Sequence, residues 1–139
     1  MKRFIPVITI VFTLFVAASC EKEEETSERF RLLTQAVWES DSLLINGEDA
    51  SGPGELLEDF RGDAIFREDF TGTFGTYEGT WKFAQNETEL VIQSDSLPAL
   101  LSTKIHELTA ESLKVSTTFP DLQNPTNPAL QIRLTFIAK

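Results

Sequence analysis

The stretch "LQIRLTFI", Leu130 to Ile137, alternates apolar and polar side chains from Leu130 to Phe136. In an extended chain, Leu130, Ile132, Leu134 and Phe136 all lie on one face. A strand with this period buries one face and keeps the other in water, which is typical of antiparallel sheets. The stretch "SLKVSTT", residues 112–118, has the same alternation. The end of the chain therefore predicts two half-buried antiparallel strands.

Short alternating runs bounded by turn residues continue back along the chain. The sequence predicts eight strands, which are Val37–Ile45, Asp63–Arg67, Gly72–Tyr77, Thr80–Phe83, Glu89–Gln93, Thr103–Leu108, Ser112–Thr118 and Leu130–Ile137. Before them, Phe30, Leu33 and Val37 recur at helical spacing. The fold expected is all-β: an eight-stranded antiparallel up-and-down barrel with a short N-terminal helix. Closure is expected because it removes the edge strands that an open sheet would expose.

The first 19 residues have the pattern of a secretory signal peptide. Lys2 and Arg3 give a positive start, an apolar run follows from Phe4 to Ala18, and small residues precede Cys20. Ordinary cleavage would leave a soluble secreted protein with a free thiol. Alternatively, small residues followed at once by cysteine resemble the lipobox of bacterial lipoproteins. This resemblance implies acyl chains on Cys20 that hold the protein in a membrane.

The residues after Cys20 are strongly acidic. Because like charges repel and no apolar side chain is present, "EKEEETSE" predicts a solvated tether over residues 20–29, followed by one domain over residues 30–139. In addition, Lys22, Glu23 and Glu24 resemble the sorting signal of lipoproteins that some Gram-negative bacteria send to the outer face of the outer membrane. That resemblance implies a lipid-anchored, surface-exposed protein of the outer membrane.

The charge of the chain argues against several classes of partner. The chain has 22 acidic and 12 basic residues and a formal net charge of -10. Loss of residues 1–19 removes Lys2 and Arg3, which leaves 10 basic residues and a net charge of -12. This net negative charge argues against binding to nucleic acid and against docking on anionic lipid head groups. Cys20 is the only cysteine, so no internal disulfide can form.

Four segments of the domain resemble the lipocalin-like domains of bacterial lipoproteins. They are "LLTQAVWES", with its tryptophan in the first strand, "AIFREDFTGTF", "YEGTWKF" and "IHELTAESLKV". The resemblance covers nearly the whole domain. It implies a lipocalin-like barrel and favours a small-molecule ligand.

The lengths of the connections predict where such a ligand would bind. Alternate connections of an up-and-down barrel lie at the same end, which brings together the long segments 46–62, 94–102 and 119–129, with a tight turn at 78–79. Long loops in a compact domain are commonly functional. We therefore expect ligand binding at this end of the barrel.

Apolar side chains in these loops are the candidate ligand contacts. We expect Leu57, Phe60, Leu97 and Leu101 to contact a small apolar or amphipathic ligand. The alternative is that these side chains plug the barrel, because native surfaces rarely leave apolar patches exposed.

The predicted barrel interior is rich in bulky side chains. The interior candidates are Phe66, Trp81, Phe83, Leu90, Ile92 and Phe136. Eight strands enclose a space that side chains can just fill, or that holds one small ligand. We therefore expect a filled interior, with any cavity small and near the mouth. A filled barrel also supports an alternative function: a structural or protein-interaction lipoprotein that contacts an envelope protein and takes no small ligand.

Residues that could perform catalysis or hold a metal are few. His106 is the only histidine, and its alternation with Ile105 predicts that it faces solvent. A hydrolytic triad needs a histidine between a nucleophile and an acid, and zinc needs several cysteine or histidine ligands. The acids of "EDFRGDAIFRED" match no EF-hand loop, and a strand divides them between the two barrel ends. The sequence predicts a noncatalytic protein without a metal site or cofactor.

Overall fold

The computed structural model describes residues 27–139. The expected signal peptide, Cys20 and the sorting signal Lys22, Glu23 and Glu24 lie outside the described residues. The elements are α1 (Glu28–Gln35), β1 (Val37–Ile45), β2 (Glu48–Asp49), the 3-10 helix η1 (Glu58–Phe60), β3 (Asp63–Phe66), β4 (Thr71–Phe74), β5 (Tyr77–Ala84), β6 (Glu89–Gln93), β7 (Leu101–Leu108), β8 (Ser112–Phe119) and β9 (Leu130–Ala138). Within this part of the chain, neither helix has the length and apolar character needed to cross a bilayer.

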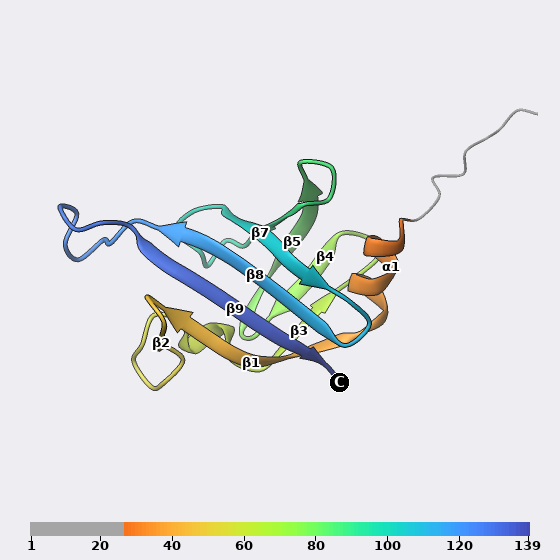
Figure 1. Cartoon of the computed structure of the whole chain (residues 1–139), viewed down its shortest axis with the longest axis horizontal. Coiled ribbons are helices and arrows are strands. Elements are labelled where there is room, and N and C mark those ends of the chain that lie inside the picture. Colours follow the sequence, from red (N-terminus) through yellow and green to blue (C-terminus); the bar gives the residue numbers. More distant parts are fainter. Residues whose placement is uncertain (1–26) are drawn as a thin grey trace, which may run out of the picture.

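The sheet closes on itself to form a barrel (Figure 1). Consecutive strands from β3 to β9 pair antiparallel, and β9 returns to pair with β1 from Trp38↔Ala138 to Ile45↔Ile132. β1 completes the ring by pairing with β3 over three residues, while its other end pairs with the two-residue strand β2. The expected eight-stranded antiparallel barrel with a short N-terminal helix is confirmed, and β2 is one added strand that the sequence did not predict.

The alternation in the last two strands has the expected consequence. Ile132, Leu134 and Phe136 of β9 are at most 6% exposed, and Leu113 and Val115 of β8 at most 2%. Burial of each such side chain contributes about 1.5–3 kcal/mol before the cost of ordering the chain is subtracted. These two strands therefore supply a large share of the core while their other faces remain in water.

The helix α1 covers the end of the barrel opposite the long connections (Figure 1). It begins after Ser27, whose Oγ accepts a hydrogen bond from the backbone N–H of Phe30 at 3.1 Å. Leu33 is fully buried, and its carbonyl accepts a hydrogen bond of 3.0 Å from Trp38 Nε1. Phe30 packs on Trp81 with ring centroids 5.6 Å apart. The helix thus closes one end and leaves the other to the loops.

One hairpin turn lies three residues earlier than predicted. The expected turn at 78–79 is found at 75–76, so β4 ends at Phe74 and β5 begins at Tyr77. Gly79, which the predicted turn included, lies inside β5, where an added Cβ would be 1.9 Å from the carbonyl oxygen of Gln93. That glycine permits a close approach between strands and does not form a turn.

Gly75 makes the real turn possible. Its φ is +63°, and an added Cβ would lie 2.1 Å from the carbonyl oxygen of Asp59 and 2.8 Å from the carbonyl carbon of Phe60. The backbone N–H of Thr76 donates to the same Asp59 oxygen at 2.8 Å. The turn between β4 and β5 therefore packs against the backbone of η1 and sets the position of Phe60.

We predict that Gly75→Ala destabilises the fold more than Gly47→Ala. Both glycines have positive φ, which costs an alanine about 1–2 kcal/mol. A Cβ on Gly47 meets no atom within 4 Å, whereas on Gly75 it meets the backbone of η1. This clash should lower the free energy of unfolding of Gly75→Ala by about 1–3 kcal/mol more, which urea unfolding of the two variants would measure. Equal losses would show that η1 moves aside freely.

Candidate functional site: the mouth of the barrel

The barrel interior is filled by its own side chains. Five of the six predicted interior residues are at most 6% exposed: Phe66, Trp81, Leu90, Ile92 and Phe136. The sixth, Phe83, is partly buried and packs on Trp81 with ring centroids 5.4 Å apart. The void that remains has a volume of about 10 Å³. One water needs about 10–15 Å³ by the same kind of measure, so a ligand has no room at the barrel centre.

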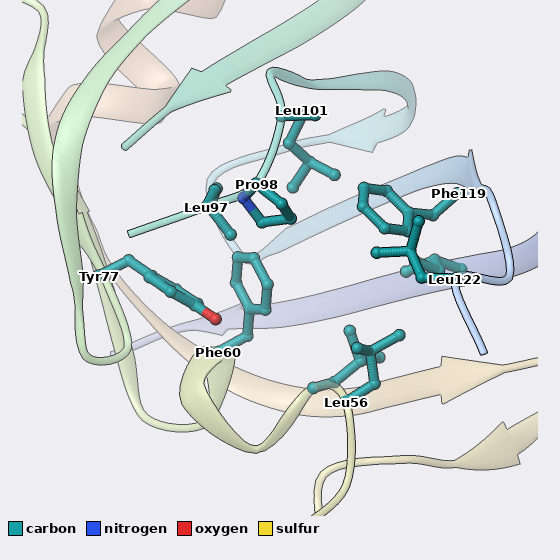
Figure 2. Close-up of a pocket in the computed structure, with 11 residues that line it drawn as sticks. Leu56, Phe60, Tyr77, Leu97, Pro98, Leu101, Phe119 and Leu122 are labelled. Carbon is teal, nitrogen blue, oxygen red and sulfur yellow. The ribbon is translucent and has the colours of Figure 1, made fainter. Parts of the chain in front are cut away.

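An apolar cavity remains at the end that carries the long connections (Figure 2). We name it the mouth pocket. Its volume is about 100 Å³, and it is lined by Leu56, Leu57, Phe60, Tyr77, Leu97, Pro98, Ala99, Leu101, Phe119, Leu122 and Ile132. The hydroxyl of Tyr77 is the only polar side-chain group in this lining. The pocket is therefore suited to apolar groups.

A wider depression adjoins the mouth pocket on its outer side. We name it the outer groove; its volume is about 390 Å³, and its lining is Ile45, Leu56, Phe119, Pro120, Asp121, Leu122, Gln123 and Leu130. Leu56, Phe119 and Leu122 line both hollows. The two together form a space that is narrow and apolar inside and wider and partly polar outside.

The structure brings together all four side chains that the sequence suggested as ligand contacts. Leu57, Phe60 and Leu101 are 2%, 7% and 7% exposed, and Leu97 is partly buried against the same core. They plug the barrel and at the same time form the inner wall of the mouth pocket. The two alternatives from the sequence are thus compatible, and contact with a ligand stays a prediction.

Backbone hydrogen bonds hold the first long loop over the barrel. The N–H of Leu57 donates to the carbonyl of Ala50 at 2.9 Å, and the N–H of Phe60 donates to the carbonyl of Leu57 at 3.1 Å. The loop therefore turns back on itself and directs Leu57 and Phe60 inward. Because this folding depends on local hydrogen bonds, the wall it forms exists without a ligand.

The second loop is tied to β5. Ser94 Oγ donates to the carbonyl of Glu78 at 2.6 Å, and the N–H of Leu97 donates to the carbonyl of Ser94 at 3.1 Å. β7 begins at Leu101, two residues before the predicted Thr103, so Leu101 is a strand residue and its position is set by the sheet.

Tyr77 is the polar group of the mouth pocket. Its ring lies 4.8 Å from that of Phe60 between centroids, and in Figure 2 its hydroxyl is directed toward Phe60. Burial, and then the negative charge of the nearby Asp59 carboxylate, raise the pKa of Tyr77 above its usual value. The hydroxyl therefore stays protonated at neutral pH and can serve as a hydrogen-bond donor.

Sequence reasoning missed part of this lining. It placed Tyr77 at the end of a strand and the segment 119–129 in a long loop, without assigning Phe119 or Leu122 to a site. The signal in the sequence was an apolar residue on each side of the Pro120–Asp121 pair, which a loop fully in water does not need. Leu56 was likewise not chosen as a contact.

The other candidate chemistry lies away from the mouth. His106 is exposed, as expected, and its Nε2 contacts the hydroxyl of Ser116 on the outside of the barrel. Glu68 and Asp69 lie in the turn between β3 and β4, at the opposite end from Glu58. Among residues 27–139, no group of three or more His, Cys, Asp or Glu side chains is placed to hold a metal ion.

A comparison of the chain with protein-family models and with curated proteins finds no match.

Tyr77 allows the electrostatics of the pocket to be measured directly, because it is the only tyrosine of the chain. We predict that ultraviolet titration of the native protein gives a phenolate midpoint above the usual value of about 10. Since the folded state holds this proton more tightly, the stability it contributes is complete below about pH 10 and is lost as pH rises through the folded pKa. Asp59→Asn should lower the midpoint. A native midpoint equal to that of the unfolded chain would contradict this environment.

Proposed function

We propose that this protein is a noncatalytic outer-membrane lipoprotein whose lipocalin-like barrel binds a small apolar or amphipathic molecule at its mouth. The observation that supports this best is that the interior is filled while an apolar pocket stays open between the long loops. Ligand sites are commonly concave, mostly apolar and furnished with few polar groups. The mouth pocket, with Tyr77 as its single polar side chain, has this character.

The rim of the mouth exposes apolar side chains. Leu56 is 53% exposed and Leu122 is 66% exposed, and both line the pocket; Leu100, at 53%, lies in the second long loop. These are three of the five large apolar side chains exposed among residues 27–139. Apolar groups gathered at one place on a surface commonly mark a binding site, because contact with an apolar partner removes them from water.

The size of the mouth pocket limits what can enter it. A cavity of about 150 Å³ accepts benzene, so the pocket of about 100 Å³ suits the end of an alkyl chain or a similarly slim group. The outer groove, at about 390 Å³, has room for more of the same molecule. The ligand we expect is therefore elongated, with its apolar tip innermost.

The position of α1 supports attachment through the closed end. Ser27 caps this helix at the end of the barrel opposite the mouth (Figure 1). Cys20 precedes Ser27 by seven residues. At about 3.3–3.6 Å per residue, these span at most about 25 Å. Acyl chains on Cys20 would hold the closed end near the membrane and leave the mouth facing water.

We predict that Leu122→Ser and Leu56→Ser each weaken the binding of a neutral single-chain probe, dodecyl maltoside below its micelle concentration, at least about 5-fold, because each removes apolar area from the pocket rim. Calorimetric titration of the purified protein measures this. The matched control is Ile137→Ser on β9, since Ile137 is 49% exposed but lies outside the mouth. Equal losses in all three variants would show that the probe binds elsewhere.

The filled interior also favours a second candidate, a protein-interaction lipoprotein. In that case the exposed Leu56 and Leu122 would contact a neighbouring envelope protein. The purified protein would then leave the neutral probe unbound, and Leu122→Ser would instead reduce cross-linking to one discrete protein in the intact envelope.

The proposed anchor has a separate test. We predict that cells fed a labelled fatty acid incorporate the label into the wild-type protein and that Cys20→Ser abolishes this, because the thiol is the proposed attachment point. External protease added to intact cells should digest the barrel if the protein faces outward. Labelling that persists in Cys20→Ser would refute attachment at this residue, and survival of the protein until the cells are lysed would refute surface exposure.

A further inference from the structure

The three long loops at the mouth of the barrel are rich in acidic residues. The first long loop contains five, Glu48, Asp49, Glu55, Glu58 and Asp59, against one basic residue, Arg61. The other two long loops contribute Asp95 and Asp121 and no basic residue. The two ion pairs formed among residues 27–139, Lys114 with Glu107 and Lys139 with Asp63, use none of these seven carboxylates. None of the seven carboxylates forms an ion pair within the described part of the chain, so the loops around the apolar pocket carry a net negative charge that the single Arg61 offsets only in part.

Asp121 lies closest to the space that a ligand would occupy, since it lines the outer groove next to Leu122. One carboxylate oxygen accepts hydrogen bonds from the backbone N–H groups of Gln123 and Asn124, both at 3.1 Å. The other accepts from the side-chain amide of Asn127 at 3.3 Å. All three donors are neutral, so they fix the carboxylate in place and leave its charge uncompensated.

Other carboxylates of the rim are held in the same manner. Glu58 Oε2 accepts from the backbone N–H of Gly54 at 2.9 Å, and Asp49 Oδ1 accepts from the backbone and hydroxyl of Ser51. Hydrogen bonds from Ser51 lower the pKa of Asp49, so this carboxylate is ionised at neutral pH. Neutral donors thus order an anionic rim around the mouth.

One aromatic side chain of the outer groove favours positive charge as well. Phe119 lines both hollows, and the face of an aromatic ring attracts a cation. A ligand carboxylate or phosphate entering this space would approach Asp121 and find no lysine or arginine in the lining of either hollow. Attraction of cations and repulsion of anions therefore both favour a cationic ligand over an anionic one.

We propose that the ligand of the mouth is a single-chain amphiphile with a cationic head group. Its alkyl end lies in the mouth pocket, and its head lies in the outer groove beside Asp121. This assignment rests on the proposed function and adds the charge of the ligand to it. Fatty acids and other anionic amphiphiles are discriminated against by the same rim.

The test uses three single-chain probes of nearly equal chain length that differ in the head group: dodecyltrimethylammonium, dodecyl maltoside and dodecanoate, each below its micelle concentration. Calorimetric titration of the purified protein should show the cation bound at least about 10-fold more tightly than the anion, with the neutral probe between them. Because the rim is exposed, added salt should reduce this preference.

Charge-neutralising variants identify the groups responsible. Asp121→Asn combined with Glu58→Gln should reduce the preference for the cation about 3- to 10-fold. The amide oxygens keep an acceptor for the backbone N–H groups of Gln123, Asn124 and Gly54, and only the hydrogen bond from Asn127 to the second oxygen of Asp121 is lost. The control is Glu68→Gln with Glu111→Gln, which removes the same charge from turns at the closed end. An equal effect of both double variants would overturn the assignment to the mouth.

The outcomes separate this inference from the function on which it rests. If all three probes bind equally and Leu122→Ser weakens each of them, the mouth binds amphiphiles but the cationic assignment is wrong. Tighter binding of dodecanoate has the same meaning. If none of the three probes binds, both the ligand-binding function and the charge assignment fail.

Discussion

The structure depends on the closure of the sheet between β1 and β9. β1 pairs with β9 over nearly its whole length but with β3 over only three residues, so the first strand is held mainly by the last. A barrel without disulfides has only its hydrogen-bonded ring and its core to keep it closed. An irregularity in register between Ser40 and Ser42 makes this closure compatible with the core. Trp38 and Leu43 are five positions apart, which would place them on opposite faces of a regular strand, and the bulge lets both face inward.

Closure and filling together decide where a ligand can go. The aromatic cluster around Trp81, supported by α1, occupies one end, and the side chains of β8 and β9 fill the middle. Only the other end is shaped by loops, and those loops insert Leu57 and Phe60 into the core before they reach the surface. The mouth pocket is thus a space between loop side chains that are already fixed by folding. A ligand there would meet preformed walls, which reduces the entropy lost on binding.

The sequence predicted the barrel well because its strands are short runs bounded by turn residues, and β8 and β9 alternate regularly over most of their length. It could not resolve the inward face of the first strand, since the bulge at Ser40–Ser42 changes the alternation midway. It misplaced one turn because the positive φ of Gly75 and the approach of η1 to this residue are not visible in the sequence. At the site, the four predicted side chains do meet, since loop lengths placed their loops at one end. Tyr77 and Phe119 could not be assigned, because their role depends on which way strand ends point at the mouth.

The acidic residues at the mouth and the exposed leucines have opposite effects on contact between two copies of the protein. The exposed Leu56 and Leu122 would favour association of two copies through their mouths. The carboxylates of the surrounding loops oppose that association, because the negative charges of the two copies repel each other. The same carboxylates also affect the affinity for ligands, because an amphiphile that covers the leucines places its head group near the carboxylates. An anionic amphiphile would be repelled by these carboxylates, in the same way as the mouth of a second copy of the protein. A cationic one would cover the apolar rim and relieve the repulsion among the carboxylates at once, so the charge that opposes contact between two mouths would also favour the proposed ligand.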